Sequence, residues 1–139
     1  MYINLKNFNF YSTTDKSGNT AIKNVILSNS SNVKHLNNDC FNNCSNLSSI
    51  NIPTSVKSLG DFCFDECSNL LSIIIPTSVK SLGAGCFKDI NSDIHFNILT
   101  SDSNEANRVG NLIKSSGGIP SGAIYYYKIN DTWTIFTPS

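Results

Sequence analysis

A 23-residue pattern of apolar and polar positions dominates the middle of the chain. The segment 40–53 (CFNNCSNLSSINIP) recurs at 63–76 (CFDECSNLLSIIIP), and the octapeptide PTSVKSLG occupies both 53–60 and 76–83. Such self-similarity indicates duplication of one structural unit. Partial copies flank the two full ones, which predicts a repeat array over residues 25–99 with two full and two degenerate repeats.

Each repeat predicts a strand, a corner and a returning turn. Residues 70–75 (LLSIII) are a β-favouring run that Pro76 ends, because proline cannot donate to a strand ladder. In the last copy, 94–98 (IHFNI) alternates as a strand with one buried face does. The spacing within 63–67 (CFDEC) suits a helical or 3₁₀ turn. One such coil cannot bury its own apolar side, so we expect stacked coils.

At these residues the chain resembles the BspA-like leucine-rich repeat family. The resemblance covers about 75 residues and rests on a leucine-serine-isoleucine-x-isoleucine-proline-x-serine-valine pattern followed by leucine-glycine and phenylalanine-cysteine, which the sequence matches at Leu70, Ile73, Ile75, Pro76, Ser78, Val79, Leu82, Gly83, Phe64 and Cys67. Cysteines replace the family's usual alanine at Cys40, Cys63 and Cys86. The resemblance implies a right-handed leucine-rich-repeat solenoid with a parallel strand ladder. Its members are often long, secreted surface proteins implicated in adhesion.

The two ends differ from the repeats. Residues 1–24 alternate loosely around a turn-rich stretch and predict an N-terminal β-hairpin cap. Residues 100–139 predict one helix and a C-terminal β-hairpin. The helix is expected from the capping-box spacing of Asp102 and Glu105, from an apolar stripe after it, and from a stop at 115–118 (SSGG). The fold class is therefore mainly β with short helical turns, terminal hairpins and one helix.

Two interpretations of the C-terminal hairpin stay open. Segments 124–129 (IYYYKI) and 132–136 (TWTIF) flank a two-residue turn. One face could close the open end of the solenoid, whereas the other could form an aromatic contact surface, since Tyr and Trp are enriched at interfaces. The candidate contact residues are Tyr125, Tyr127 and Trp133.

Composition excludes several classes of function. Basic and acidic residues number ten each, and Arg108 is the sole arginine, whereas a nucleic-acid surface needs clustered cations. No apolar run reaches the 18 or so residues of a membrane span. Residues 1–10 lack the basic start and apolar stretch of a signal peptide, so we expect no membrane insertion and synthesis in a reducing cytoplasm.

The five cysteines offer three interpretations. Pairs at 40/44 and 63/67 could hold zinc, or cysteines in neighbouring coils could form a disulfide. Every cysteine spacing also follows from the repeat, which favours buried, reduced thiols that bind no cofactor. An odd count of thiols in one column suits a reducing compartment.

The remaining polar residues favour a non-catalytic protein. His35 and His95 lie at no recognisable spacing from a nucleophile, and Asp61, Asp65 and Glu66 are interpreted as a solvated corner, with a calcium site as the alternative. Lysines recur at one repeat position and predict an outward column, which is either a solvated edge or a surface for an acidic partner. These lysines are Lys34, Lys57 and Lys80.

The sequence therefore predicts a module that contacts another protein or copies of itself. The first hypothesis is an accessory subunit of a larger assembly that presents its strand face or lysine edge. The alternatives are a structural virion component, such as a decoration or fibre-associated protein of a phage, and a fragment of a surface adhesin. No enzyme activity, metal or cofactor is expected.

Overall fold

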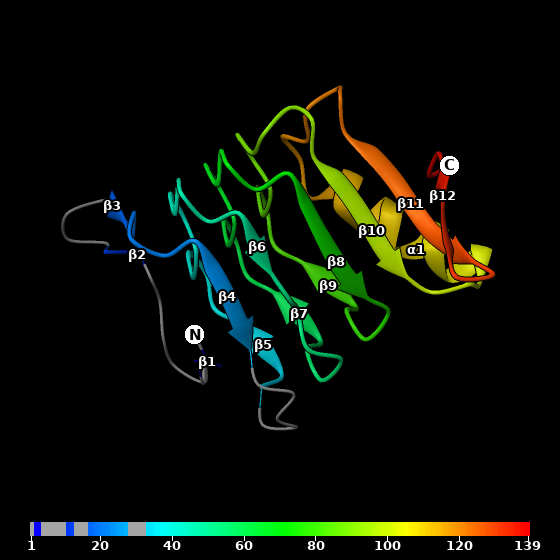
Figure 1. The fold of residues 1–139 in the computed structure, drawn as a ribbon, viewed down its shortest axis with the longest axis horizontal. Helices are drawn as coiled ribbons and strands as arrows, with labels where there is room; N and C mark the ends of the chain where they lie inside the picture. The colour runs from blue at the N-terminus through cyan, green and yellow to red at the C-terminus, as the bar shows by residue number, and fades with distance from the viewer. Residues whose placement is uncertain (1, 4–10, 13–16, 28–32) are drawn as a thin grey trace.

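The computed structural model describes residues 2–3, 11–12, 17–27 and 33–139. Parallel strands from successive coils form one ladder along the molecule (Figure 1). In spatial order its parallel strands are β1 (Tyr2–Ile3), β4 (Asn24–Leu27), β6 (Ser49–Ile50), β8 (Ser72–Pro76), β10 (His95–Leu99) and β11 (Ile124–Ile129). The first three form one sheet, and the last three form a second sheet to which β12 (Thr132–Phe136) adds an antiparallel fourth strand. A bridge between Asn51 and Ile74 joins β6 to β8. The predicted solenoid of stacked coils is confirmed.

A second, shorter ladder forms the opposite side of each coil. It consists of β5 (His35–Leu36), β7 (Ser58–Leu59) and β9 (Ser81–Leu82), all parallel. Leu36 pairs with Leu59 and Leu59 with Leu82, so neighbours in the ladder are 23 residues apart. The sequence period therefore equals one full turn of the chain.

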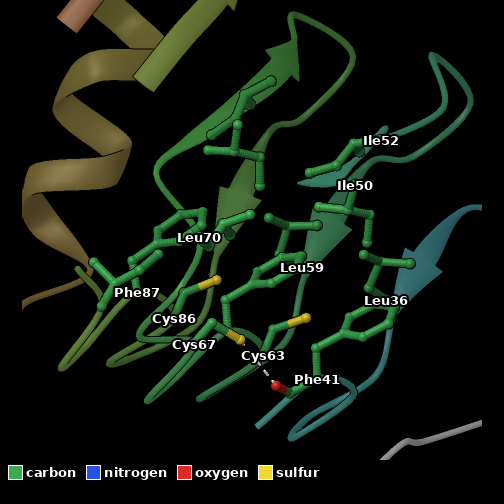
Figure 2. Packing of buried hydrophobic residues seen from close by; sticks show 14 of the residues in the cluster. Leu36, Phe41, Ile50, Ile52, Leu59, Cys63, Cys67, Leu70, Cys86 and Phe87 are labelled. Atoms are coloured by element: carbon green, nitrogen blue, oxygen red, sulfur yellow. Dashed lines mark hydrogen bonds between the residues drawn. The ribbon is translucent and has the colours of Figure 1, made fainter. Parts of the chain in front are cut away.

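A column of aromatic rings runs through the core. Phe41 stacks on Phe64 with ring centroids 5.3 Å apart, and Phe64 stacks on Phe87 at 5.5 Å. Phe96 meets Phe87 edge-on at 5.0 Å, and Tyr125 stacks on Phe96 at 5.4 Å. Rows of leucine, isoleucine and cysteine flank the rings (Figure 2). The apolar side of each coil is thus buried against the next coil, because no single coil could cover it.

Residues with positive φ recur at regular intervals in the returning turns. These residues form two columns of 23-residue spacing, namely Asp39, Phe62 and Gly85, and Asn43, Glu66 and Asp89. Main-chain bonds such as Cys67 N–H to Phe64 O, 3.2 Å, make these segments turns of the predicted tightness. The residues of positive φ change the direction of the chain at each short turn, which keeps the coil compact.

Helix α1 (Ser103–Ser115) covers the last coil (Figure 1). Asp102 caps it by accepting hydrogen bonds from the main-chain N–H groups of Asn104 and Glu105. The reciprocal bond of a capping box is not made, because the Glu105 carboxylate instead pairs with Arg108 at 2.7 Å. That guanidinium lowers the pKa of Glu105 and also donates to the carbonyls of Thr77 and Val79, 2.9 and 3.0 Å away. The sole arginine therefore fastens α1 to the last full repeat.

An antiparallel strand pair occurs near each end, and the predicted N-terminal cap over 1–24 falls partly on residues 1, 4–10 and 13–16, which lie outside the described residues. β11 and β12 pair antiparallel around a turn at Asn130 and Asp131. Near the start, β2 (Tyr11–Ser12) pairs antiparallel with β3 (Ser17–Gly18), whereas β1 lies parallel to β4 as a further rung of the ladder. Among the described residues, no helix combines the length and apolar character needed to cross a membrane.

Candidate binding surface on the strand ladder

The outward face of the ladder carries one row of residues in register. Strand pairing aligns Asn51 with Ile74, Ile74 with Asn97, Asn97 with Tyr126 and Tyr126 with Ile135. We call these five residues the ladder row. Ile74 is 43% exposed and Ile135 is 62% exposed, whereas Ile73 and Ile75 beside Ile74 are buried. The strand alternation therefore places large apolar side chains on the surface, with amides between them.

The amide at one end of the ladder row is already used within the fold. The Asn51 side chain accepts a hydrogen bond from the Leu27 main-chain N–H at 2.8 Å and donates to the Leu27 carbonyl at 3.2 Å. It thereby extends the pairing between β4 and β6 where β6 has ended. Beside Tyr126 of the row, the ring of His95 lies 5.1 Å from the tyrosine ring and borders the row.

The aromatic candidates of the C-terminal hairpin separate onto its two faces. Tyr125 is buried on Phe96, and burial raises its pKa, so it belongs to the core and not to an exposed surface. Tyr127 lies on the same inward side, with its ring 5.4 Å from Phe136. Trp133 is half-buried on the outward side under the Lys128 ammonium, which lies 5.2 Å from its ring centroid. Tyr126 of the ladder row was not among the predicted contact residues.

The three candidate lysines form the predicted column. Lys57 N–H donates to the Lys34 carbonyl at 2.6 Å, and Lys80 N–H donates to the Lys57 carbonyl at 2.7 Å. All three side chains are exposed. A shallow, open cavity of about 360 Å³ separates this column from the end of the ladder, and its lining includes Lys57, Lys80, Pro76, Leu99 and Glu105. The lysine column thus lies beside the ladder face.

An acidic cluster lies on the returning turns. Carboxylate oxygens of Asp65, Glu66 and Asp89 lie within 4.8 Å of one another. Asp61, which was expected in this cluster, instead accepts a hydrogen bond from the Ala84 main-chain N–H at 2.9 Å. The sequence signal for Asp89 was its 23-residue distance from Glu66. Partial burial and, to a smaller extent, repulsion from Glu66 raise the pKa of Asp65 to about 6. The Oδ1 atom of Asp65 is buried without a hydrogen-bond partner.

We expect Asp65→Asn to stabilise the protein at pH 7. The folded-state pKa of about 6 lies above the usual 3.8, so the fold binds a proton more tightly than the unfolded chain and loses stability as pH rises from about 4 to about 6. Asn42, at the equivalent repeat position, already shows that an amide fits there. Because Asp65 is partly exposed, screening limits the gain to about 1 kcal/mol.

Urea unfolding at pH 7 and pH 4 measures this difference. The gain should be present at pH 7 and largely absent at pH 4, where Asp65 is protonated in the fold. Asp93→Asn, at an exposed carboxylate outside the cluster, is the matched control and should change stability little at either pH. An equal gain at both pH values would contradict the electrostatic origin.

All five cysteines are buried and unbridged. Burial raises the pKa of Cys63 well above its ordinary value, and contacts of the Cys63 thiol with Cys40 and Cys86 add a smaller effect in the same direction. Burial raises the pKa of Cys44 to about 11, and the Cys67 thiol donates to the Phe41 carbonyl at 3.1 Å (Figure 2). The raised pKa values keep Cys44 and Cys63 as thiols rather than thiolates at neutral pH, and a thiol is neither a good nucleophile nor a good metal ligand.

Together the repeated coil, the parallel ladder and the constant 23-residue period define a leucine-rich repeat solenoid. A sequence model of the BspA type leucine-rich repeat region matches residues 1–95 in six copies. The chain therefore belongs to the BspA type leucine-rich repeat family. This fold is typically non-catalytic, and membership of a leucine-rich repeat family indicates a protein-interaction module.

Comparison with solved structures agrees with this assignment. The chain is similar to a leucine-rich repeat protein from Bacteroides ovatus, with 25% identity, a TM-score of 0.52 and 92% of the chain covered. The match covers 25% of the Bacteroides protein, so the chain spans about a quarter of its length. No curated protein matches the chain significantly.

Proposed function

We propose that the chain is a non-catalytic subunit of a larger assembly and binds its partner protein through the outward ladder face. The observation that carries this proposal is the exposure of large apolar side chains in register across the ladder. Ile26 of β4 is 45% exposed on the same strand ladder, in addition to Ile74 and Ile135. Several large apolar side chains exposed on one face, with polar groups beside them, are typical of sites that bind proteins.

The surroundings of the ladder face indicate the chemistry of the partner. The Asn97 amide supplies a hydrogen-bond donor and an acceptor between Ile74 and Tyr126 of the ladder row. The lysine column beside the face adds positive charge along one edge. A partner with an apolar strip bordered by carboxylates would match this surface, and the charged edge would mainly increase the association rate.

Site-specific photocrosslinking in cells that make the protein tests this proposal. A photoreactive amino acid at position 74 should capture a defined partner, whereas the same amino acid at exposed position 115 on α1 should not. Ile135→Glu in the position-74 protein should reduce capture about tenfold or more, which corresponds to about 1.4 kcal/mol.

A matched substitution away from the face controls for general effects. Ser92→Glu changes an exposed loop residue and should leave capture unchanged. The proposal fails if positions 74 and 115 capture the same proteins with equal yield, or if the two glutamate variants behave alike.

A further inference from the structure

β12 forms an open edge of the ladder. Within the described part of the chain, it pairs with β11 and with no other strand. Its hairpin turn has φ values of 47° at Asn130 and 61° at Asp131, as in a two-residue turn of the primed type. Such a turn makes Ile129 and Thr132 a hydrogen-bonded pair. An edge that ends a sheet leaves alternate main-chain groups available.

The hairpin geometry identifies those main-chain groups. Hydrogen-bonded and non-hydrogen-bonded pairs alternate along an antiparallel ladder. Since Thr132 bonds to β11, so do Thr134 and Phe136, which are two and four residues further on. The main-chain N–H and C=O groups of Trp133 and Ile135 therefore point away from β11, toward the open edge.

β12 lacks the features that protect edge strands from pairing. Natural edge strands carry lysine, proline or a bulge, or are covered by another element. The five residues of β12 (TWTIF) include no charge, proline or glycine. Ile135 is also the most exposed of the exposed large apolar residues in the described chain.

We propose that β12 pairs antiparallel with β12 of a second copy about a two-fold axis at Thr134. In this register Trp133 of each copy lies opposite Ile135 of the other and exchanges both main-chain bonds with it. Two such pairs give four hydrogen bonds and use all the outward main-chain groups of Trp133 and Ile135. The two four-stranded sheets would become one continuous sheet across the dimer.

Side chains of β12 support a second copy as the occupant. On the outward face, each Trp133 would pack against Ile135 of the other copy, and aromatic–β-branched pairs are favourable cross-strand neighbours. No like charges meet, because β12 has no charged side chain. A closed two-fold contact of identical strands is self-complementary. A five-residue strand pair buries less than the roughly 800 Å² per partner of a standard interface, so the dimer should be weak and concentration-dependent.

Sedimentation velocity under reducing conditions, from about 1 µM to about 1 mM, tests the proposal. The native chain should show a reversible monomer–dimer equilibrium. Ile135→Lys should weaken dimerisation about tenfold or more, because it places a cation on the pairing edge. Ile74→Lys makes the same change at an exposed ladder position away from the edge, and should leave the equilibrium unchanged.

Crosslinking tests the register. Thr134 lies opposite Thr134 of the second copy as a non-hydrogen-bonded pair, with Cα atoms about 4.5 Å apart, which suits a disulfide. Thr134→Cys should therefore form an interchain disulfide with oxidised glutathione as the oxidant. Thr132→Cys is the control, since its two copies would lie about 13 Å apart at 3.3 Å per residue.

Three outcomes would overturn the proposal. The first is a native chain that remains monomeric through the whole series. The second is an equal effect of Ile74→Lys and Ile135→Lys, which would indicate association through the ladder face. The third is equal crosslinking at positions 132 and 134, which would exclude the two-fold axis at Thr134.

Discussion

Phe64→Ala is expected to destabilise the fold by about 3–5 kcal/mol, the range for removing a fully buried phenylalanine ring. Phe64 has no exposed surface and stacks between Phe41 and Phe87 in the middle of the aromatic column. Alanine would leave a cavity between two coils that main-chain bonds hold at a fixed separation, so collapse around it is restricted. Since a domain is typically stable by 5–15 kcal/mol, this loss is a large part of the total.

Phe62→Ala is the matched control for Phe64→Ala. Phe62 is 38% exposed and has a φ of 56°, which strains alanine and phenylalanine similarly. Its ring lies against Gly85, so some packing is lost, and we expect a cost below about 1 kcal/mol. Urea unfolding followed by circular dichroism and by Trp133 fluorescence measures both variants. Similar costs for the two would contradict the role of the aromatic column.

Gly83→Ala is expected to cost about 3 kcal/mol, at the upper end of the range for overpacking. Gly83 has an ordinary φ, so a methyl group would cause no backbone strain there. A Cβ would instead overlap the main-chain N of Asp61 and lie 2.5 Å from the carbonyl C of Gly60 in the preceding coil. These backbone atoms cannot move aside without separating the coils, which would weaken the shorter ladder.

Gly117→Ala isolates the cost of conformation from the cost of contact. Gly117 has a φ of 86° with open space around its Cα, so alanine there meets strain but no neighbour. We expect a cost of about 1 kcal/mol, which thermal or urea unfolding resolves. If Gly83→Ala cost no more than Gly117→Ala, close approach between coils would not be the reason for glycine at position 83.

The repeat made the coils and their core predictable from the sequence. Once the period of 23 residues was recognised, a core position in one coil predicted the equivalent core positions in the others, including Phe64 and Cys67. The helix was predictable from Asp102 and its apolar stripe. The contact of Arg108 with the Val79 carbonyl was not, because the two residues are 29 apart in the sequence and only the packing of α1 brings them together.

The C-terminal hairpin shows where sequence reasoning was insufficient. Alternation in 124–129 gives the strand two faces but does not decide which of them points to the core. A register shift of one residue would exchange the two faces. Parallel pairing of β11 with β10 decides it by placing Tyr125 beside Phe96 and Tyr126 beside Asn97. The strand for which closure of the solenoid and an aromatic contact surface were both open therefore continues the ladder and supplies Tyr126 to the candidate surface.

The fixed offset between coils has a consequence for how the chain folds. Main-chain bonds between coils join residues about 22–24 apart, as from Phe41 to Cys63, Lys57 to Lys34 and Gly83 to Leu59. Each added coil therefore closes a loop of nearly constant length, at nearly constant entropic cost. Folding should start at the two near-identical repeats over 40–83 and spread outward coil by coil, as in a one-dimensional array with nearest-neighbour coupling.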